Sequence, residues 1–384
     1  MSQRLDAAAM MAAASAATGL SNYGDLSFLE PLEQLVDAVS LNGTLDEAGL
    51  AGFEADMIRL LCTRLAIEAA ITAHPEILDE DVSDPIVITG LPRTGTTKLH
   101  RVLATDPRLQ KLLLWRGLFP APIAPLGTVP DPRIAITDEQ VAAMAARHPD
   151  LMAAHPWSTH EPEEDGLLLQ LTFRTLNTGW ICHGYSFIEW VTQQDQTPAY
   201  ADLRRTLQYL QWQDGGRQGR PWLLKAPIHL SALSVIMSTF PGATVVHCHR
   251  DLHETVASAA KLYEIAHVAF GADHVELDQI GQNTLMCALG WEANLAQRAG
   301  VNPAQILDVD YEEICSDVSG VIGSILASRG VGHEPETLAA IAGWERENPQ
   351  YRNGRSNYSL DRYGLTPRQV DVAFANYTAF FART

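Results

Sequence analysis

Residues 86–103 hold the groups in this chain that are best placed to bind an anion. A run rich in β-branched residues is followed by a loop rich in glycine and proline and then by an amphipathic segment, which predicts a strand, a tight turn and a helix. Such a turn gathers unpaired backbone N–H groups and the positive end of a helix dipole around one point, where a negative charge is stabilised. Arg93 adds a fixed positive charge, and Thr94, Thr96 and Thr97 add hydroxyl groups. The chemistry expected here is the binding of a phosphate-like group.

The loop differs from the common loop that binds nucleoside triphosphates. That pattern requires a glycine, four residues, a second glycine, a lysine, and then serine or threonine. Gly90 and Gly95 have this spacing, but Thr96 stands in the position of the lysine, and the positive charge lies inside the loop at Arg93. We therefore expect an anion to bind without a lysine that reaches a γ-phosphate. The alternative is a strand-to-helix turn that binds nothing.

Two later strands are expected to end next to basic residues. The apolar run 222–224 predicts a buried strand that ends at Lys225, and the run 243–248 predicts another that is followed by Arg250. Ligands of open α/β sheets bind at the carboxyl ends of the strands, so we expect Lys225 to face a ligand rather than to reach the solvent. Ser258 follows Arg250 by eight residues, about two turns into the next expected helix.

Ionisable residues are dense in the segment 157–166. These acids could be a solvated helix start, since acids favour the N-terminal end of a helix dipole, or could present a carboxylate or an imidazole to a substrate. The residues concerned are His160, Glu161, Glu163, Glu164 and Asp165.

The composition limits the classes of partner and the compartment. The 384 residues carry 46 acidic and 27 basic side chains, a net charge of −19, which argues against nucleic acid and against an anionic membrane surface. We found no apolar window long enough for a transmembrane helix. The cysteines are odd in number, scattered and without a CxxC pair, which favours reduced thiols in a cytoplasmic protein over disulfides or a zinc site. They are Cys62, Cys182, Cys248, Cys287 and Cys315.

The order of the expected elements predicts an α/β fold. Residues 1–83 carry apolar residues at helical spacing and predict an N-terminal helical region that packs on the core. From residue 84 to 384, strands alternate with helices, which predicts a central, mostly parallel sheet with helices on both faces, a three-layer arrangement. Between them, residues 116–132 are too rich in proline for a continuous helix or a central strand and predict a long surface excursion.

Three of these motifs together resemble the PAPS-dependent sulfotransferases, in particular the bacterial branch and its putative mycobacterial members. The first is residues 92–97, Pro-Arg-Thr-Gly-Thr-Thr; the second is a strand that ends in Lys225 with His229 close behind it; the third is Arg250 with Ser258 eight residues later. The resemblance covers about residues 84–384 and implies a P-loop-like fold.

The resemblance also implies a role for each matching residue. The loop would bind the 5′-phosphosulfate of PAPS through Arg93, Thr94, Gly95, Thr96 and Thr97. Arg250 and Ser258 would bind the 3′-phosphate, and Arg352 and Gly354 could stand for a C-terminal family loop on the same phosphate. Lys225, Arg93 and His229 would be the catalytic residues.

The general base is the part of the site that the resemblance fixes least. His229 lies four residues after Lys225, whereas animal members have this histidine two residues after the lysine. His229 is the first candidate because the imidazole pKa lies near neutrality, and its alternative is a helix-start residue with a structural hydrogen bond. His160, Glu161 and Glu163 are the rival bases. The residue that stacks on the adenine ring is not identified, since Lys98 stands where relatives often have an aromatic residue.

The expected activity is transfer of a sulfuryl group from PAPS to a hydroxyl or amine of a partly apolar small molecule or glycolipid, with PAP as the product and no metal. A second copy of the chain is a further candidate partner. Two alternatives stay open at this point. One is a P-loop kinase that uses ATP and magnesium on a small molecule, and the other is an inactive relative that binds a nucleotide or a lipid.

Overall fold

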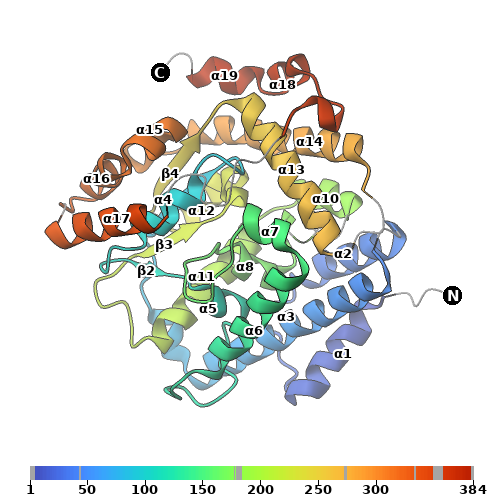
Figure 1. The fold of residues 1–384 in the computed structure, drawn as a ribbon. Coiled ribbons are helices and arrows are strands. Elements are labelled where there is room, and N and C mark those ends of the chain that lie inside the picture. The colour runs from blue at the N-terminus through green and yellow to red at the C-terminus, as the bar shows by residue number, and fades with distance from the viewer. Residues whose placement is uncertain are drawn as a thin grey trace.

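Five parallel strands form the centre of the molecule (Figure 1). The computed structural model describes residues 5–42, 45–176, 178, 184–271, 275–332, 334–348 and 358–381. The strands lie in the order β2-β3-β1-β4-β5. Their bounds are β1 Ile86–Gly90, β2 Gln110–Lys111, β3 Trp222–Lys225, β4 Thr244–His249 and β5 Ile306–Asp310. The predicted parallel sheet is confirmed, while β2 is a short edge strand that the sequence pattern did not predict.

Helices cover both faces of the sheet because neighbouring residues of β1 point to opposite sides. Ile86 and Ile88 pack in a core with residues of α4 and α16, whereas Val87 packs in a second core with residues of α11 and α12. Every residue of β1 is buried, as expected for a parallel strand with helices on both faces. The three-layer arrangement expected from the sequence is therefore present.

The strand order reverses its direction of growth beside β1. From β1 the chain moves to one side of the sheet to form β2 and β3, and it then crosses to the other side to form β4 and β5. The carboxyl ends of β1 and β4 thus lie where the direction of winding reverses, which is the place where open α/β sheets bind ligands.

The segment between β1 and β3 is mostly helical. The helix α6 begins at Pro132, because Pro132 fits the first turn of a helix and Asp131 caps it. Residues 119–131 form no helix or strand, in agreement with the predicted excursion. The elements are α4 Thr96–Leu103, α5 Leu114–Leu118, α6 Pro132–Arg147, α7 Pro149–Ala154, α8 Gly166–Leu169, η2 Gln170–Thr172, α10 Tyr185–Thr192 and α11 Thr197–Gln213.

The remaining helices follow β3, β4 and β5. Between the strands lie η3 Pro227–Ala232, α12 Leu233–Thr239, α13 Leu252–Ala269, α14 Leu277–Arg298 and η4 Pro303–Gln305. After β5 come α15 Tyr311–Ser316, α16 Val318–Ser328, α17 Pro335–Glu347, η5 Asp361–Tyr363, α18 Pro367–Ala373 and α19 Ala375–Phe381.

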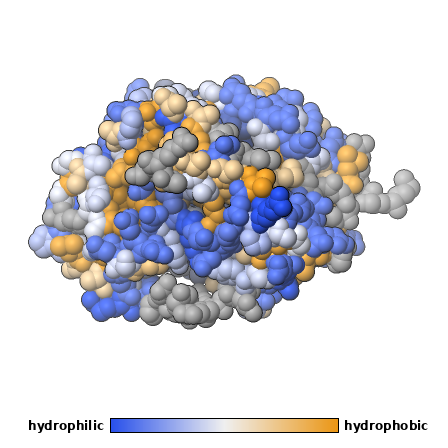
Figure 2. Space-filling model, turned by 90° about the horizontal axis from the view of Figure 1, so that it is seen from above, coloured by the Kyte–Doolittle hydropathy of each residue, from blue (hydrophilic) through white to orange (hydrophobic). Residues whose placement is uncertain are grey.

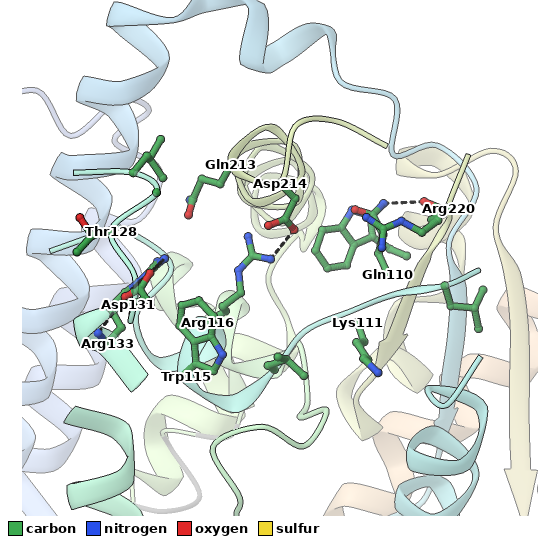
Figure 3. Close-up of a pocket in the computed structure, with 15 residues that line it drawn as sticks. Gln110, Lys111, Trp115, Arg116, Thr128, Asp131, Arg133, Gln213, Asp214 and Arg220 are labelled. Atoms are coloured by element: carbon green, nitrogen blue, oxygen red, sulfur yellow. Dashed lines mark hydrogen bonds and ion pairs between the residues drawn. The ribbon is translucent and has the colours of Figure 1, made fainter. Parts of the chain in front are cut away.

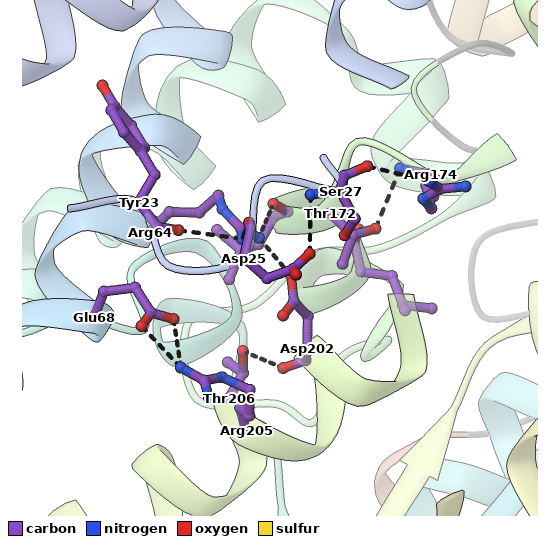
Figure 4. A network of polar contacts seen from close by, with 12 residues as sticks. Tyr23, Asp25, Ser27, Arg64, Glu68, Thr172, Arg174, Asp202, Arg205 and Thr206 are labelled. Atoms are coloured by element: carbon purple, nitrogen blue, oxygen red, sulfur yellow. Dashed lines mark hydrogen bonds and ion pairs between the residues drawn. The ribbon is translucent and has the colours of Figure 1, made fainter. Parts of the chain in front are cut away.

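The N-terminal region consists of helices, as predicted. Its elements are α1 Ala7–Thr18, α2 Leu29–Asn42, α3 Glu47–Ala73 and η1 Pro75–Asp79. Arg64 of α3 reaches Asp202 of α11 at 2.6 Å and the carbonyl of Leu171, and Arg205 of α11 pairs with Glu68 at 2.6 Å (Figure 4). These ion pairs connect α3 with α11. A domain boundary at residues 83 and 84 stays a prediction.

The face in Figure 2 is mostly hydrophilic, with separate hydrophobic patches between the polar residues. Within the described residues, no helix combines the length and the apolar character that crossing a membrane requires.

Candidate active site

The loop after β1 has an unusual backbone. Gly90 has a φ angle of 151° and Gly95 of 88°, and Arg93 has a φ angle of 76°, which non-glycine residues seldom adopt. A Cβ atom on Gly90 would lie 2.5 Å from the carbonyl oxygen of Cys248, so only glycine allows the loop to pass so close to β4. Gly95 is the N-cap of α4, and the unpaired N–H groups of the first turn follow it. Strain in such a loop is typical of ligand sites.

The three threonines of the loop have different partners. The Thr94 hydroxyl is fully buried and donates to the carbonyl of Leu91 at 2.8 Å, so it holds the loop together. The Thr97 hydroxyl accepts a hydrogen bond from Nζ of Lys225 at 3.4 Å. Thr96 is the first residue of α4 and is buried. Of the three hydroxyls, the one of Thr97 is thus joined to a predicted catalytic residue.

Arg93, Arg250 and Ser258 lie together although they come from three elements. Nε of Arg93 donates to the Ser258 hydroxyl of α13 at 3.2 Å, and Nη1 of Arg250 donates to the carbonyl of Arg93 at 3.1 Å. The Arg250 guanidinium also pairs with Glu254 at 2.5 Å and lies 4.2 Å from the ring centre of Tyr311. In the part of the chain that the structure describes, no carboxylate pairs with Arg93. Burial lowers the pKa of Arg93, and a bound anion would stabilise its charge.

Lys225 contacts the phosphate loop through Thr97. Its side chain is 1% exposed, and Nζ is 2.6 Å from Oε1 of Glu164. Its backbone N–H donates to Oδ1 of Asp165 at 2.8 Å. Because β3 is parallel to β1, with Ile88 opposite Lys225, the ammonium group reaches the same end of the sheet as the phosphate loop.

His229 is buried behind Lys225. Its Nε2 is 2.8 Å from Oδ2 of Asp165, and its Nδ1 is 2.8 Å from the hydroxyl of Tyr200. The ring is 1% exposed, and Asp165 is fully buried. Burial would raise the pKa of Asp165, but His229 and the backbone N–H of Lys225 hold it below its usual value. This geometry gives His229 structural hydrogen bonds, the alternative that we considered, and leaves neither ring nitrogen free. A role as general base stays a prediction that the geometry does not favour.

The rival bases lie on the segment that also carries Glu164. His160 is exposed, and Glu161 lies 3.9 Å from Arg101. Glu163 is buried, and its Oε1 is 3.3 Å from Nε2 of His155. Burial alone would raise the pKa of Glu163, but the charges of His155 and Lys225 hold it below its usual value. Glu164 is the acid on this segment whose carboxylate contacts the ammonium group of Lys225. The sequence did not single it out.

Backbone pairing explains why sequence patterns missed this arrangement. The chain after β2 runs antiparallel to the acidic segment, with an isolated bridge between Leu113 and Pro162. The N–H of Glu163 donates to the carbonyl of Leu112 at 2.8 Å, and the N–H of Leu114 donates to the carbonyl of Glu161 at 3.1 Å. Which acid faces Lys225 thus depends on a pairing between residues about 50 positions apart, which local spacing does not encode.

His100, on α4, is a second residue that sequence reasoning missed. It is 1% exposed, and neither ring nitrogen has a hydrogen-bond partner in the described residues. Burial, together with the charge of Lys225, lowers its pKa to about 3, so the ring is neutral at physiological pH. Buried polar atoms are usually paired, so these two are an exception among the described residues.

Two clusters in the described residues have ligand types that metals accept. One consists of His155, Glu163 and Glu164, and the other of His247, His249 and Asp308. In each cluster a cation already neutralises a carboxylate, since Lys225 lies 2.6 Å from Glu164 and Arg298 lies 2.6 Å from Asp308. The absence of a metal requirement stays a prediction. Arg352 and Gly354 lie outside the described residues.

Comparison with known proteins gives the family. Residues 85–335, more than half of the chain, match the sulfotransferase family. The chain belongs to the sulfotransferase family. The expected fold and the expected class of enzyme are thereby confirmed.

Solved structures of mycobacterial enzymes are similar to this sulfotransferase over almost their full length. Sulfotransferase STF1 from Mycobacterium tuberculosis H37Rv is 30% identical, with 98% of this chain and 100% of that chain covered and a TM-score of 0.85. STF9 from Mycobacterium avium is 25% identical, with 99% and 97% covered and a TM-score of 0.88. The omega-hydroxy-beta-dihydromenaquinone-9 sulfotransferase Stf3 of Mycobacterium tuberculosis is 23% identical over 304 residues, which are 74% of this chain and 71% of Stf3. The resemblance to mycobacterial sulfotransferases is confirmed.

Proposed function

We propose that this sulfotransferase transfers the sulfuryl group of PAPS to a hydroxyl or amine of a partly apolar small molecule or glycolipid. The observation that carries the proposal is the convergence of three separate motifs at the carboxyl ends of β1, β3 and β4. The phosphate loop, Lys225 and the Arg250–Ser258 pair come from distant parts of the sequence, and the contacts of Arg93 and Thr97 join them.

The donor would lie across the carboxyl ends of β1 and β4. Its 5′-phosphosulfate would take the N–H groups of the loop and of the first turn of α4, near Thr97 and Lys225. Its 3′-phosphate would lie near Arg250 and Ser258, where charge-assisted hydrogen bonds would hold it. Arg93, which has no carboxylate partner in the described residues, would gain an anionic one.

The transfer would be an in-line substitution at sulfur. The acceptor oxygen or nitrogen forms a bond to sulfur while the bond from sulfur to the bridging oxygen breaks, and PAP leaves with the negative charge of that oxygen. Lys225, Arg93 and the loop N–H groups would stabilise this charge, since preorganised donors act most strongly where charge develops. The acceptor proton must pass to a base.

Glu164 is the base that the geometry supports best. Its carboxylate pairs with Lys225 at 2.6 Å. Once a phosphosulfate occupies the loop, Lys225 would have an anionic partner there, and Glu164 would be released beside the reacting sulfur. His229 would then act through Asp165, which holds the backbone of Lys225.

A partly apolar acceptor is supported by one relative, whose name gives a lipid-like menaquinone derivative as its substrate. A cytoplasmic location and a homodimer remain part of the proposal, and sedimentation of the purified protein tests the second. The activity itself is tested by incubating the protein with ³⁵S-labelled PAPS and a panel of phenols, sterols, hydroxylated quinones and glycolipids. Label should pass to at least one acceptor in the wild type and in a Lys98→Gln variant, but not in Lys225→Met. Transfer that survives in Lys225→Met would contradict the proposed site.

A further inference from the structure

A cavity of about 390 Å³ lies at the edge of the sheet, beside β2 and the start of β3 (Figure 3). Gln110 of β2 and Trp222 of β3 are opposite each other in the sheet, and both line the cavity. Trp222 and Lys225 are the two ends of β3, so about 10 Å of strand separates the cavity from the catalytic lysine. The cavity is therefore distinct from the candidate active site.

Buried polar atoms without partners gather around this cavity. In the described residues, Oε1 of Gln110, Nε1 of Trp222 and Nε of Arg220 have no hydrogen-bond partner, and all three residues line the cavity. Gln110 is 5% exposed and Trp222 is 2% exposed. The amide nitrogen of Gln110 already donates to Gln211 and to the carbonyl of Arg220, so its oxygen is left as an acceptor. Gln110, Trp222 and Arg220 therefore carry one acceptor and two donors that no group of the described residues satisfies, although buried polar groups are normally satisfied.

The cavity is rich in positive charge although the chain is acidic. Four basic side chains line it, against two carboxylates. Arg116 pairs with Asp214 at 2.5 Å, and Arg133 pairs with Asp131 at 2.7 Å. The remaining cations, Lys111 and Arg220, have no carboxylate partner among the described residues. In a chain with a net charge of −19, this local excess favours an anionic ligand.

The lining of the cavity also includes apolar side chains, namely those of Trp115, Leu113 and Leu126. The guanidinium of Arg133 lies 4.6 Å from the centre of the Trp115 ring, which fixes the orientation of that ring. The volume falls in the range of small-molecule sites, and an aromatic side chain in the lining suits an aromatic ligand.

We propose that this cavity is a second ligand site, separate from the site of sulfuryl transfer, that binds a small aromatic carboxylate. The carboxylate accepts from Nε of Arg220 and Nε1 of Trp222, a hydroxyl on the ring donates to Oε1 of Gln110, and the ring packs against Trp115. Residues 112–114 follow β2 in the chain and are hydrogen-bonded to residues 161–163. A ligand in the cavity would therefore lie next to a segment that is paired with the one that carries Glu164.

The test uses ¹⁹F NMR with two matched probes on the full chain. The probes are 3-fluoro-4-hydroxybenzoate and 3-fluoro-4-hydroxybenzyl alcohol, which differ in the negative charge. We expect the benzoate to bind with a Kd below about 1 mM and the alcohol at least tenfold more weakly, about the effect of one charge-assisted hydrogen bond.

Three variants locate the binding. Arg220→Gln removes an unpaired cation, and Thr128→Trp fills the cavity from an exposed loop position, so each should weaken benzoate binding at least about tenfold while the thermal midpoint is kept. Arg250→Gln alters the proposed donor site and should leave benzoate binding unchanged. Because Thr128 is exposed, its variant carries the test if Arg220→Gln fails to fold.

Three results would overturn the proposal. The first is no binding of the benzoate, which would mean that water alone satisfies the three polar atoms. The second is equal binding of acid and alcohol, which would remove the role of charge. The third is loss of binding in Arg250→Gln but not in Thr128→Trp, which would place the anion at the phosphate loop. The transfer of sulfuryl groups is measured separately, by the assay with labelled PAPS, so the two proposals fail independently.

Discussion

At the scale of single residues, the contact between Lys225 and Glu164 links the structure most directly to the rate. Glu164→Gln keeps the size of the side chain and a hydrogen bond but removes the proposed base. We expect turnover to fall by about two to four powers of ten, with the affinity for PAP little changed. Steady-state kinetics with PAPS and an identified acceptor measure this. Glu161→Gln is the matched control, since Glu161 is on the same segment, 3.9 Å from Arg101, and should keep its turnover.

His229 differs from Glu164 because we expect it to act through Asp165 and not as the base. His229→Ala is expected to lower turnover by about two powers of ten or more while PAPS affinity stays similar. If the ring acts through Asp165 and Lys225, the pH dependence of the remaining activity should keep the apparent pKa values of the wild type. Full turnover in Glu164→Gln together with a changed pH profile in His229→Ala would make His229 the base instead.

At the scale of elements, the phosphate loop depends on the glycine at the end of β1. An alanine at position 90 would meet the carbonyl oxygen of Cys248 at 2.5 Å, so the loop would have to move away from β4. We expect Gly90→Ala to weaken PAP binding at least about tenfold and to lower stability by roughly 1–3 kcal/mol.

The control for this loop is Gly19→Ala, at the end of α1. Gly19 also has a positive φ angle, 69°, but a Cβ there meets no atom within 4 Å. The Gly19→Ala variant should therefore show the cost of backbone strain alone and should bind PAP as the wild type does. Calorimetry and thermal unfolding of both variants separate strain from the close contact, and normal PAP binding by Gly90→Ala would show that the loop tolerates the change.

The elements also show how far a sequence pattern predicts the site. β1, β3 and β4 are apolar runs that end in glycine or next to basic residues, so the strand ends predicted that Arg93, Lys225 and Arg250 would lie at the same edge of the sheet. Glu164, His100 and the partners of His229 are set by contacts between distant segments, such as the pairing of Leu113 with Pro162. Side-chain direction in these contacts follows from packing, which periodicity does not describe.

At the scale of the whole molecule, buried histidines make stability depend on pH. Burial lowers the pKa of His100 to about 3, and burial with the charges of His249 and Arg298 lowers the pKa of His247. In the unfolded chain both would titrate near 6.5. As the pH falls below about 6.5, the unfolded chain therefore binds protons that the folded chain does not, and the free energy of unfolding falls by up to about 1.4 kcal/mol per pH unit for each histidine.

Urea unfolding at pH 7, 6 and 5 measures this dependence. The wild type should lose stability over this range. His100→Gln should lose less, because its free energy of unfolding no longer depends on the one proton that His100 binds in the unfolded chain. Asp308, with a pKa held at about 2 by its hydrogen bonds to His249 and Arg298, loses its contribution at lower pH and does not disturb the comparison. Equal slopes in the wild type and in His100→Gln would show that His100 is protonated without cost in the fold.

The central claim for the whole molecule is that the residues at the carboxyl ends of β1, β3 and β4 bind a nucleotide with a 3′-phosphate. Calorimetry without magnesium, with PAP and with its analogue that lacks the 3′-phosphate, tests it most directly. We expect PAP to bind at least about tenfold more tightly than the analogue, and Arg250→Ala to remove most of that difference. Equal affinity for both ligands, an equal loss for both in Arg250→Ala, or binding of ATP with magnesium in place of PAP would contradict the account.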